Sequence, residues 1–274
     1  EVHKSISKGI EIESIDNYNI SNNIDENVAG IAAQAMLKNI DIDFGFKIII
    51  NKGIKPGSGI GSSAASSAGT VYAINQLLNS HFDNLDLVRF SMEGENFVSG
   101  SYHADNVAPI ILGGITLVRS ISDLDIIKLP SPKSLEVIII RPNIEIKTSD
   151  SRRVVKKKVK IEKMVQQSAN LGAFISSLYS EDFDLMSRSV VDEVVEPDRS
   201  MLIPEFESIK KISTESGALS CGISGSGPSI FALSNNSETS KIILNNVCSH
   251  LDKVRIDYDS FISKVNPKGI KILD

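Results

Sequence analysis

A short segment rich in glycine and serine is the first part of this sequence that could do chemistry. It consists, in order, of Pro56, Gly57, Ser58, Gly59, Ile60, Gly61, Ser62, Ser63, Ala64, Ala65 and Ser66. Glycines let consecutive backbone N–H groups converge on one anion, and the free N–H groups of a following helix add to the attraction. Ser62 and Ser63 supply hydroxyls that can cap the helix, bind phosphate or hold a magnesium ion. The segment therefore predicts a phosphate-binding loop.

Two better-known phosphate-binding fingerprints do not match this loop. A Walker A loop ends in Gly-Lys-Ser/Thr, but no lysine follows Gly61, and a dinucleotide-binding loop needs glycine where Ser62 stands. A flexible linker or a tight turn would also use glycine and serine. Pro56 at the entry and the alanine-rich stretch that follows favour a phosphate loop. A second glycine-rich stretch, Gly222–Ser229, indicates by itself only a hairpin turn.

A dense polar cluster lies between Ser99 and Pro109. It holds a histidine, a carboxylate and an amide at His103, Asp105 and Asn106. The carboxylate could receive an ammonium group, while the histidine and the amide offer hydrogen bonds to a hydroxyl or a carboxylate. An Asp/Asn turn with a histidine by chance is the alternative interpretation. The cluster is a candidate site for a small polar substrate.

The elements that must position these groups are mixed helices and strands. Residues 2–15 alternate like a strand, 46–50 form a branched apolar strand before the loop, and the spacing of apolar residues predicts helices over 63–78 and 86–97. The remaining expected elements are a turn running into a strand at 106–118, a strand at 135–141, helices at 161–178 and 185–194, and strands at 218–221 and 229–233. The phosphate loop thus joins a strand to a helix.

Composition limits the class of protein. The chain has 274 residues, a formal net charge of −5 and two cysteines without metal-site or disulfide spacing. No stretch approaches the roughly 20 apolar residues that cross a bilayer, and the start lacks a secretion signal. We expect a cytoplasmic protein with neither a membrane nor a nucleic acid as partner. The basic run between Arg153 and Lys160 lacks interleaved aromatics and indicates a solvated surface.

The two glycine-rich stretches together carry a family resemblance. Pro56–Ala65 resembles the second motif of the GHMP kinases, the superfamily named for galacto-, homoserine, mevalonate and phosphomevalonate kinases, and Gly222–Ser229 resembles the third. The resemblance implies an α+β, two-lobed fold. Residues 1–135 would be an ATP-binding lobe like domain 2 of ribosomal protein S5, and residues 136–274 a ferredoxin-like lobe. It further implies that Pro56–Ser66 bind ATP, with Mg²⁺ held by Ser63 and Glu95.

The string His103-Ala-Asp-Asn-Val-Ala-Pro109 is similar to the homoserine kinase family in particular. Two later segments, Thr148–Arg152 and Glu196–Arg199, also resemble that family, and arginine suits a carboxylate because its planar fork donates two parallel hydrogen bonds. The resemblance implies phosphorylation of L-homoserine in threonine biosynthesis. The implied substrate-binding residues are His103, Asp105, Asn106, Thr148, Arg152 and Arg199. The implied catalytic residues are Asn106, close to the reacting group, and Arg199, with no catalytic base.

Some alternatives stay open at this stage. Another GHMP kinase, of mevalonate or shikimate type, would share the glycine-rich motifs, and a nucleotide-binding relative without turnover would keep the loop. The resemblance also implies a homodimer. It does not cover the start of the chain, where homoserine kinases have an opening strand and an Ala/Ser/Asn-rich loop. The chain is then either a fragment that has lost its natural start or a shortened protein. If these 274 residues are all there is, we expect weak or no kinase activity.

Overall fold

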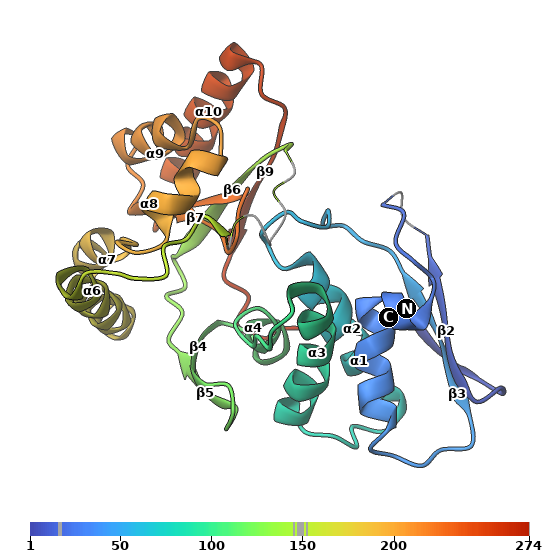
Figure 1. The fold of residues 1–274 in the computed structure, drawn as a ribbon. Coiled ribbons are helices and arrows are strands. Elements are labelled where there is room, and N and C mark those ends of the chain that lie inside the picture. The colour runs from blue at the N-terminus through green and yellow to red at the C-terminus, as the bar shows by residue number, and fades with distance from the viewer. Residues whose placement is uncertain (16–17, 145, 147–150, 152, 274) are drawn as a thin grey trace. The chain divides into compact units, whose positions relative to one another are not determined.

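The computed structural model describes residues 1–15, 18–144, 146, 151 and 153–273 (Figure 1). They form two compact units. The first comprises Glu1–Pro56, Gly61–Lys128 and Asn266–Asp274, and the second comprises Gly57–Ile60 and Leu129–Val265. The lobe boundary expected between residues 135 and 136 stays a prediction. No helix within the described residues is both long and apolar enough to cross a membrane.

The sheet of the first unit is built around one buried strand. Its strands are β1 (Val2–Ser5), β2 (Gly9–Ser14) and β3 (Gly45–Ile50), in the order β1-β3-β2. β3 is antiparallel to β1 and parallel to β2. Phe46, Ile48 and Ile50 are buried in the core of this unit, as the alternating pattern of a half-covered strand requires. The strand expected at 46–50 is confirmed.

Helices form the rest of the first unit. They are the 3₁₀ turn η1 (Ile24–Glu26), α1 (Val28–Leu37), α2 (Ser62–Leu77), α3 (Asn84–Ser99) and α4 (Val107–Leu112). α1, α2 and α3 pack against one another (Figure 1). Gly94 permits the close approach, because a Cβ there would lie 2.3 Å from Ser67 Oγ and 2.7 Å from Val28 O. The missing side chain therefore brings neighbouring residues of α3 close to the first turns of α2.

Two further segments complete the first unit. β4 (Ile115–Ser120) and β5 (Asp125–Leu129) form a two-stranded sheet. Residues 266–273 return to α4, where Ile270 N–H donates to Ile110 O at 2.9 Å. The turn expected at the start of 106–118 is the short helix α4. Because α4 has only six residues and Pro109 lies in its first turn, no helical periodicity develops in the sequence.

The second unit has an antiparallel sheet in the order β7-β8-β6-β9. Its strands are β6 (Glu136–Pro142), β7 (Ser220–Ile223), β8 (Ile230–Ser234) and β9 (Tyr258–Lys264). Its helices are α6 (Ile161–Ser180), α7 (Phe183–Ser189), α8 (Glu196–Arg199), η2 (Ser200–Leu202), α9 (Phe206–Glu215) and α10 (Ser237–Val254). Branched residues of β6, such as Ile138 and Ile140, pack with Ile209 of α9 and Val247 of α10.

Two helices of this unit differ from expectation. α6 forms where the apolar spacing predicts it, but its apolar face is largely exposed, with Ile161 at 69% and Val165 at 63% exposure, while Leu178 is buried. α7 ends at Ser189, so Val194 lies outside the helix expected over 185–194. The apolar pattern alone thus predicted the helices, but neither the burial of α6 nor the end of α7.

Candidate active site

The phosphate loop ends at the start of α2 in the first unit. Gly61 is the residue before α2, with φ +78° and no side-chain hydrogen bond that caps the helix. The first helical bond here is Ala65 N–H to Gly61 O at 2.9 Å, so the N–H groups of residues 62–64 precede the helical ladder. Ser62 Oγ donates to Ile54 O at 2.7 Å, and Lys52 Nζ donates to Ser62 Oγ at 3.2 Å. A helix start with free donors and a nearby cation suits an anion.

Glu95 is a buried carboxylate beside this helix start. Only 8% of the residue is exposed, and its Oε1 has no hydrogen-bond partner among the described residues. Burial raises the pKa of Glu95 and the charge of Asp105 adds to the rise, while a hydrogen bond from Ser63 and the charge of Lys52 oppose it. A buried carboxylate with an unused oxygen next to a serine hydroxyl has the oxygen donors that Mg²⁺ prefers.

The polar cluster before α4 lies near the same helix start. A Cβ built on Gly61 would be 3.7 Å from Asn106 Oδ1, so the amide is adjacent to the first residue before α2. His103 Nε2 is 2.8 Å from Ser101 Oγ, and its Nδ1 is 4.0 Å from Asp105 Oδ1. The Asp105 side chain is 69% exposed and available to a ligand. Predicted metal and substrate residues of the first unit are therefore brought together.

A cavity of about 300 Å³ lies beside α2, within the first unit. One wall is the strand end and turn Ile48–Ile54, and the other is the face of α2 that carries Ala65, Ser66 and Gly69. Ser62 also lines it. Apolar side chains line the cavity together with polar ones such as Lys52, Ser66 and Thr70, a mixture that is usual for small-molecule sites.

The other part of the phosphate loop, Gly57–Ile60, packs in the second unit against the glycine-rich turn between β7 and β8. Ser224 Oγ donates to Gly59 O at 2.9 Å, and Ser229 Oγ donates to Ser58 O at 2.6 Å. A Cβ on Gly59 would stand 2.5 Å from Gly227 O, so no larger residue fits there. The Ser58 hydroxyl is buried and has no hydrogen-bond partner in the described part of the chain. The two glycine-rich motifs thus form one packed structure.

Comparisons with known proteins identify the family of this chain. The model of the GHMP kinases N terminal domain family matches residues 27–114, and that of the GHMP kinases C terminal family matches residues 174–253. A homoserine kinase from Chlorobium phaeobacteroides (strain BS1) is 39% identical over 239 residues, which are 86% of this chain and 74% of that protein. The crystal structure of homoserine kinase from Cytophaga hutchinsonii has a TM-score of 0.94 at 42% sequence identity, covering 98% of this chain and 86% of that one.

This chain belongs to the homoserine kinase family. The α+β fold expected from the glycine-rich motifs is confirmed. The structure of L. major mevalonate kinase in complex with R-mevalonate matches with a TM-score of 0.73 at 15% identity, covering 96% of this chain and 85% of that one. That likeness shows a shared fold and nothing more specific. The homoserine kinase relatives extend the resemblance seen in the His103–Pro109 string to most of the chain.

Of the remaining predicted residues of this homoserine kinase family member, Arg199 lies in the second unit. Arg199 ends α8, where its Nη1 donates to Gly225 O at 3.0 Å and its Nε donates to Ser151 O at 3.2 Å. Its role at the substrate carboxylate stays a prediction. Thr148 and Arg152 lie outside the described residues.

Sequence reasoning missed Lys52. This lysine lies two residues after the end of β3, and its ammonium group contacts the backbone and hydroxyl of Ser62, at 3.2 Å each. A cation at the end of the strand that feeds the loop was the available signal. It was not used because the Walker A pattern places its lysine after the glycines instead.

Proposed function

We propose that this chain transfers the γ-phosphoryl group of ATP to the side-chain hydroxyl of L-homoserine. The products would be ADP and O-phospho-L-homoserine, an intermediate of threonine biosynthesis. Membership of the homoserine kinase family supports this proposal. The structural observation that carries it is the buried Glu95 carboxylate, which lies beside Ser63 at the start of the helix that follows the phosphate loop.

The nucleotide would use groups of the phosphate loop and of the turn that leads into it. The start of α2 and the Lys52 ammonium group suit the phosphates, because the helix start presents backbone N–H donors and the lysine presents positive charge. The buried Ser58 hydroxyl is a further donor without a present use. The cavity beside α2, about 300 Å³ in volume, is large enough for the base of a nucleoside. We infer that Pro56–Ser66 bind ATP, with residues 51–54 next to the nucleoside.

Magnesium fits the residues present. Glu95 Oε1 is buried without a hydrogen-bond partner in the described structure, and the Ser63 hydroxyl is the adjacent oxygen donor. No cluster of three His, Cys, Asp or Glu exists among the described residues. That agrees with Mg²⁺, which takes one or two carboxylates plus substrate phosphates. When bound, the ion would neutralise charge on the phosphate oxygens during transfer.

The amino acid would be held by the polar cluster. Asp105 would bind the ammonium group, and His103 and Asn106 would orient the reacting hydroxyl by hydrogen bonds. Arg199 is our candidate for the carboxylate. The hydroxyl oxygen would form a bond to the γ-phosphorus as the bond to ADP breaks, and the hydroxyl proton would leave to solvent. Orientation of this sort can supply roughly 7–11 kcal/mol of the barrier, so the proposal needs no strong base.

The test is ADP release by this chain with ATP, Mg²⁺ and one of three alcohols, L-homoserine, mevalonate or shikimate. We expect any turnover to occur with L-homoserine alone. Turnover with mevalonate or shikimate but not L-homoserine would replace the proposed substrate. Calorimetric ATP binding with no product from any alcohol would instead favour a nucleotide-binding protein without turnover. Mass spectrometry of the product confirms the site of phosphorylation.

A further inference from the structure

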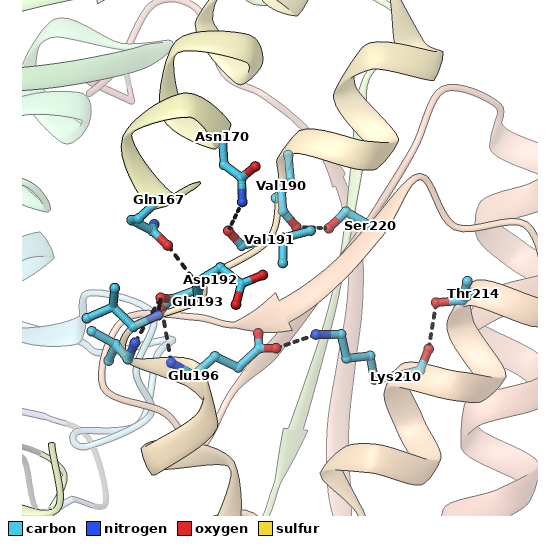
Figure 2. Close-up of polar contacts among 12 residues, drawn as sticks. Gln167, Asn170, Val190, Val191, Asp192, Glu193, Glu196, Lys210, Thr214 and Ser220 are labelled. Atoms are coloured by element: carbon cyan, nitrogen blue, oxygen red, sulfur yellow. Dashed lines mark hydrogen bonds and ion pairs between the residues drawn. The ribbon is translucent and has the colours of Figure 1, made fainter. Parts of the chain in front are cut away.

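The segment that leads into α8 is held from several sides within the second unit (Figure 2). Asp192 Oδ1 accepts from the N–H groups of Val194 and Val195 at 2.9 Å each, and its Oδ2 accepts from Glu196 N–H at 3.1 Å. From α6, Asn170 Nδ2 donates to Val191 O at 3.1 Å. The entry to α8 is therefore fixed by side-chain hydrogen bonds rather than by regular structure.

Glu196, the first residue of α8, links three elements. Its carboxylate pairs with Lys210 of α9, as Figure 2 shows, and accepts from the backbone N–H of Ile223 at the end of β7. The side chain of Glu196 is only 12% exposed. A Cβ built on Gly222 would lie 2.9 Å from Glu196 Oε2, so the carboxylate lies directly against the strand that leads into the glycine-rich turn.

The glycine-rich turn connects α8 to the phosphate loop through hydrogen bonds. Ile223 is followed at once by Ser224, whose hydroxyl donates to Gly59 O at 2.9 Å. At the other end of α8, Arg199 Nη1 donates to Gly225 O at 3.0 Å. The short helix thus contacts the turn at both of its ends, and the turn contacts the loop.

We propose that Glu196, paired with Lys210, is a positioning residue that sets the glycine-rich turn and, through it, the phosphate-binding loop at Gly57–Ile60. This inference rests on the proposed function only in taking the loop to bind nucleotide phosphates. Groups that hold a binding loop in its productive geometry act on affinity through the residues they support.

The environment of Glu196 agrees with a functional role. Burial raises the pKa of Glu196, and the Lys210 ammonium group opposes this rise without cancelling it. The folded protein therefore bears a cost for keeping this carboxylate ionised. The Lys210 side chain is 34% exposed, so it can turn to water if its partner loses its charge. Carboxylates held at such a cost are often found at functional sites.

The test uses Glu196→Gln and Lys210→Met with matched controls on α9. Lys211 and Glu215 form an ion pair on the surface of α9, with side chains 73% and 66% exposed. Lys211→Met and Glu215→Gln therefore repeat the same chemical changes where no contact reaches the turn. Dissociation constants for ADP with Mg²⁺ are measured by calorimetry well below each melting temperature, and ATP KM and kcat are measured with L-homoserine.

We expect Glu196→Gln and Lys210→Met to raise the ADP dissociation constant by about three- to tenfold, with the effect on turnover mainly in the KM for ATP. Glu196→Gln should keep Tm within about 4 °C of the parent. Both controls should bind ADP as the parent does. Gly222→Ala, whose methyl group would displace the carboxylate without a change of charge, should weaken ADP binding too, and it serves if Glu196→Gln does not fold.

Unchanged ADP affinity in Glu196→Gln, Lys210→Met and Gly222→Ala would overturn the inference, as would equal losses in the controls. A parent chain that binds ADP but does not phosphorylate L-homoserine would refute the proposed function and leave the positioning role standing. A parent chain that binds no ADP would refute both.

Discussion

The Glu95→Gln variant tests whether the Glu95 carboxylate holds Mg²⁺ or only packs between α2 and α3. The residue is 8% exposed and one carboxylate oxygen has no hydrogen-bond partner among the described residues. Burial raises the pKa of Glu95 above its value in the unfolded chain. The ionised carboxylate therefore destabilises the fold at neutral pH, and this penalty decreases as the pH falls through the folded-state pKa.

The raised pKa of Glu95 sets the expected effect of the substitution on stability. A buried charged oxygen without a partner costs about 1–3 kcal/mol or more, whereas glutamine has the same shape without the charge. We expect Glu95→Gln to change the free energy of unfolding by no more than about 1 kcal/mol, in the stabilising direction. If the carboxylate holds Mg²⁺, its loss should lower kcat on the order of 10²–10³-fold, as the loss of one preorganised electrostatic contact does.

The assay combines ADP release over a range of Mg²⁺ concentrations with thermal melts at several pH values. Glu93→Gln, on the same helix and with its carboxylate near the Tyr102 hydroxyl, is the control and should retain activity. The stability difference between Glu95→Gln and the parent should shrink as the pH is lowered. A variant that loses several degrees of Tm but keeps kcat within threefold would show that Glu95 packs the α2–α3 contact and holds no metal.

Three further predictions test the fold and the site. Gly94→Ala should destabilise the first unit by about 1–3 kcal/mol in denaturant unfolding, because its Cβ would overlap α2. Gly172→Ala, with open space around it, is the control and should be neutral or stabilising. Equal effects of the two substitutions would contradict the close packing at Gly94. Burial raises the pKa of Cys221 to about 12, so a Cys248→Ser variant should show no thiol reaction at pH 8 until it is unfolded, and rapid native labelling would contradict this burial. Asp105→Asn should raise the KM for L-homoserine about tenfold or more with ATP KM unchanged, and an effect on ATP alone would remove Asp105 from the amino-acid site.

Local sequence signals were sufficient for the elements that flank the first glycine-rich loop. Gly61 takes a positive φ just before α2, a conformation that glycine adopts at little cost. The strand before the loop and the helix after it also follow from residues close in sequence. The same holds for β7 and β8 around the glycine-rich turn. These predictions needed no knowledge of contacts between distant segments.

What the sequence did not reveal depends on such distant contacts. Gly57–Ile60 packs with a turn more than a hundred residues later, and residues 266–273 return to α4 of the first unit. No local periodicity records either contact. Lys52 is a different case, because its contact with Ser62 spans only ten residues and the Walker A pattern looks for a lysine after the glycines instead. The role of Glu196 also needed the structure, because α9 and β7 are distant from it in sequence.

Among the described residues, the carboxylates whose pKa the fold shifts divide by the direction of the shift. Hydrogen-bond donors lower the pKa of Glu136, Asp198 and Glu205. In these three the fold favours the charged form, as expected of groups that cap or tether structure. Burial raises the pKa of Glu95 and Glu196 instead, so the fold holds each at a cost. Glu196 is supplied with a lysine and a backbone N–H, whereas Glu95 keeps an oxygen without a partner in the described structure. That difference is why we assign one carboxylate to positioning and the other to a ligand that the protein itself does not provide.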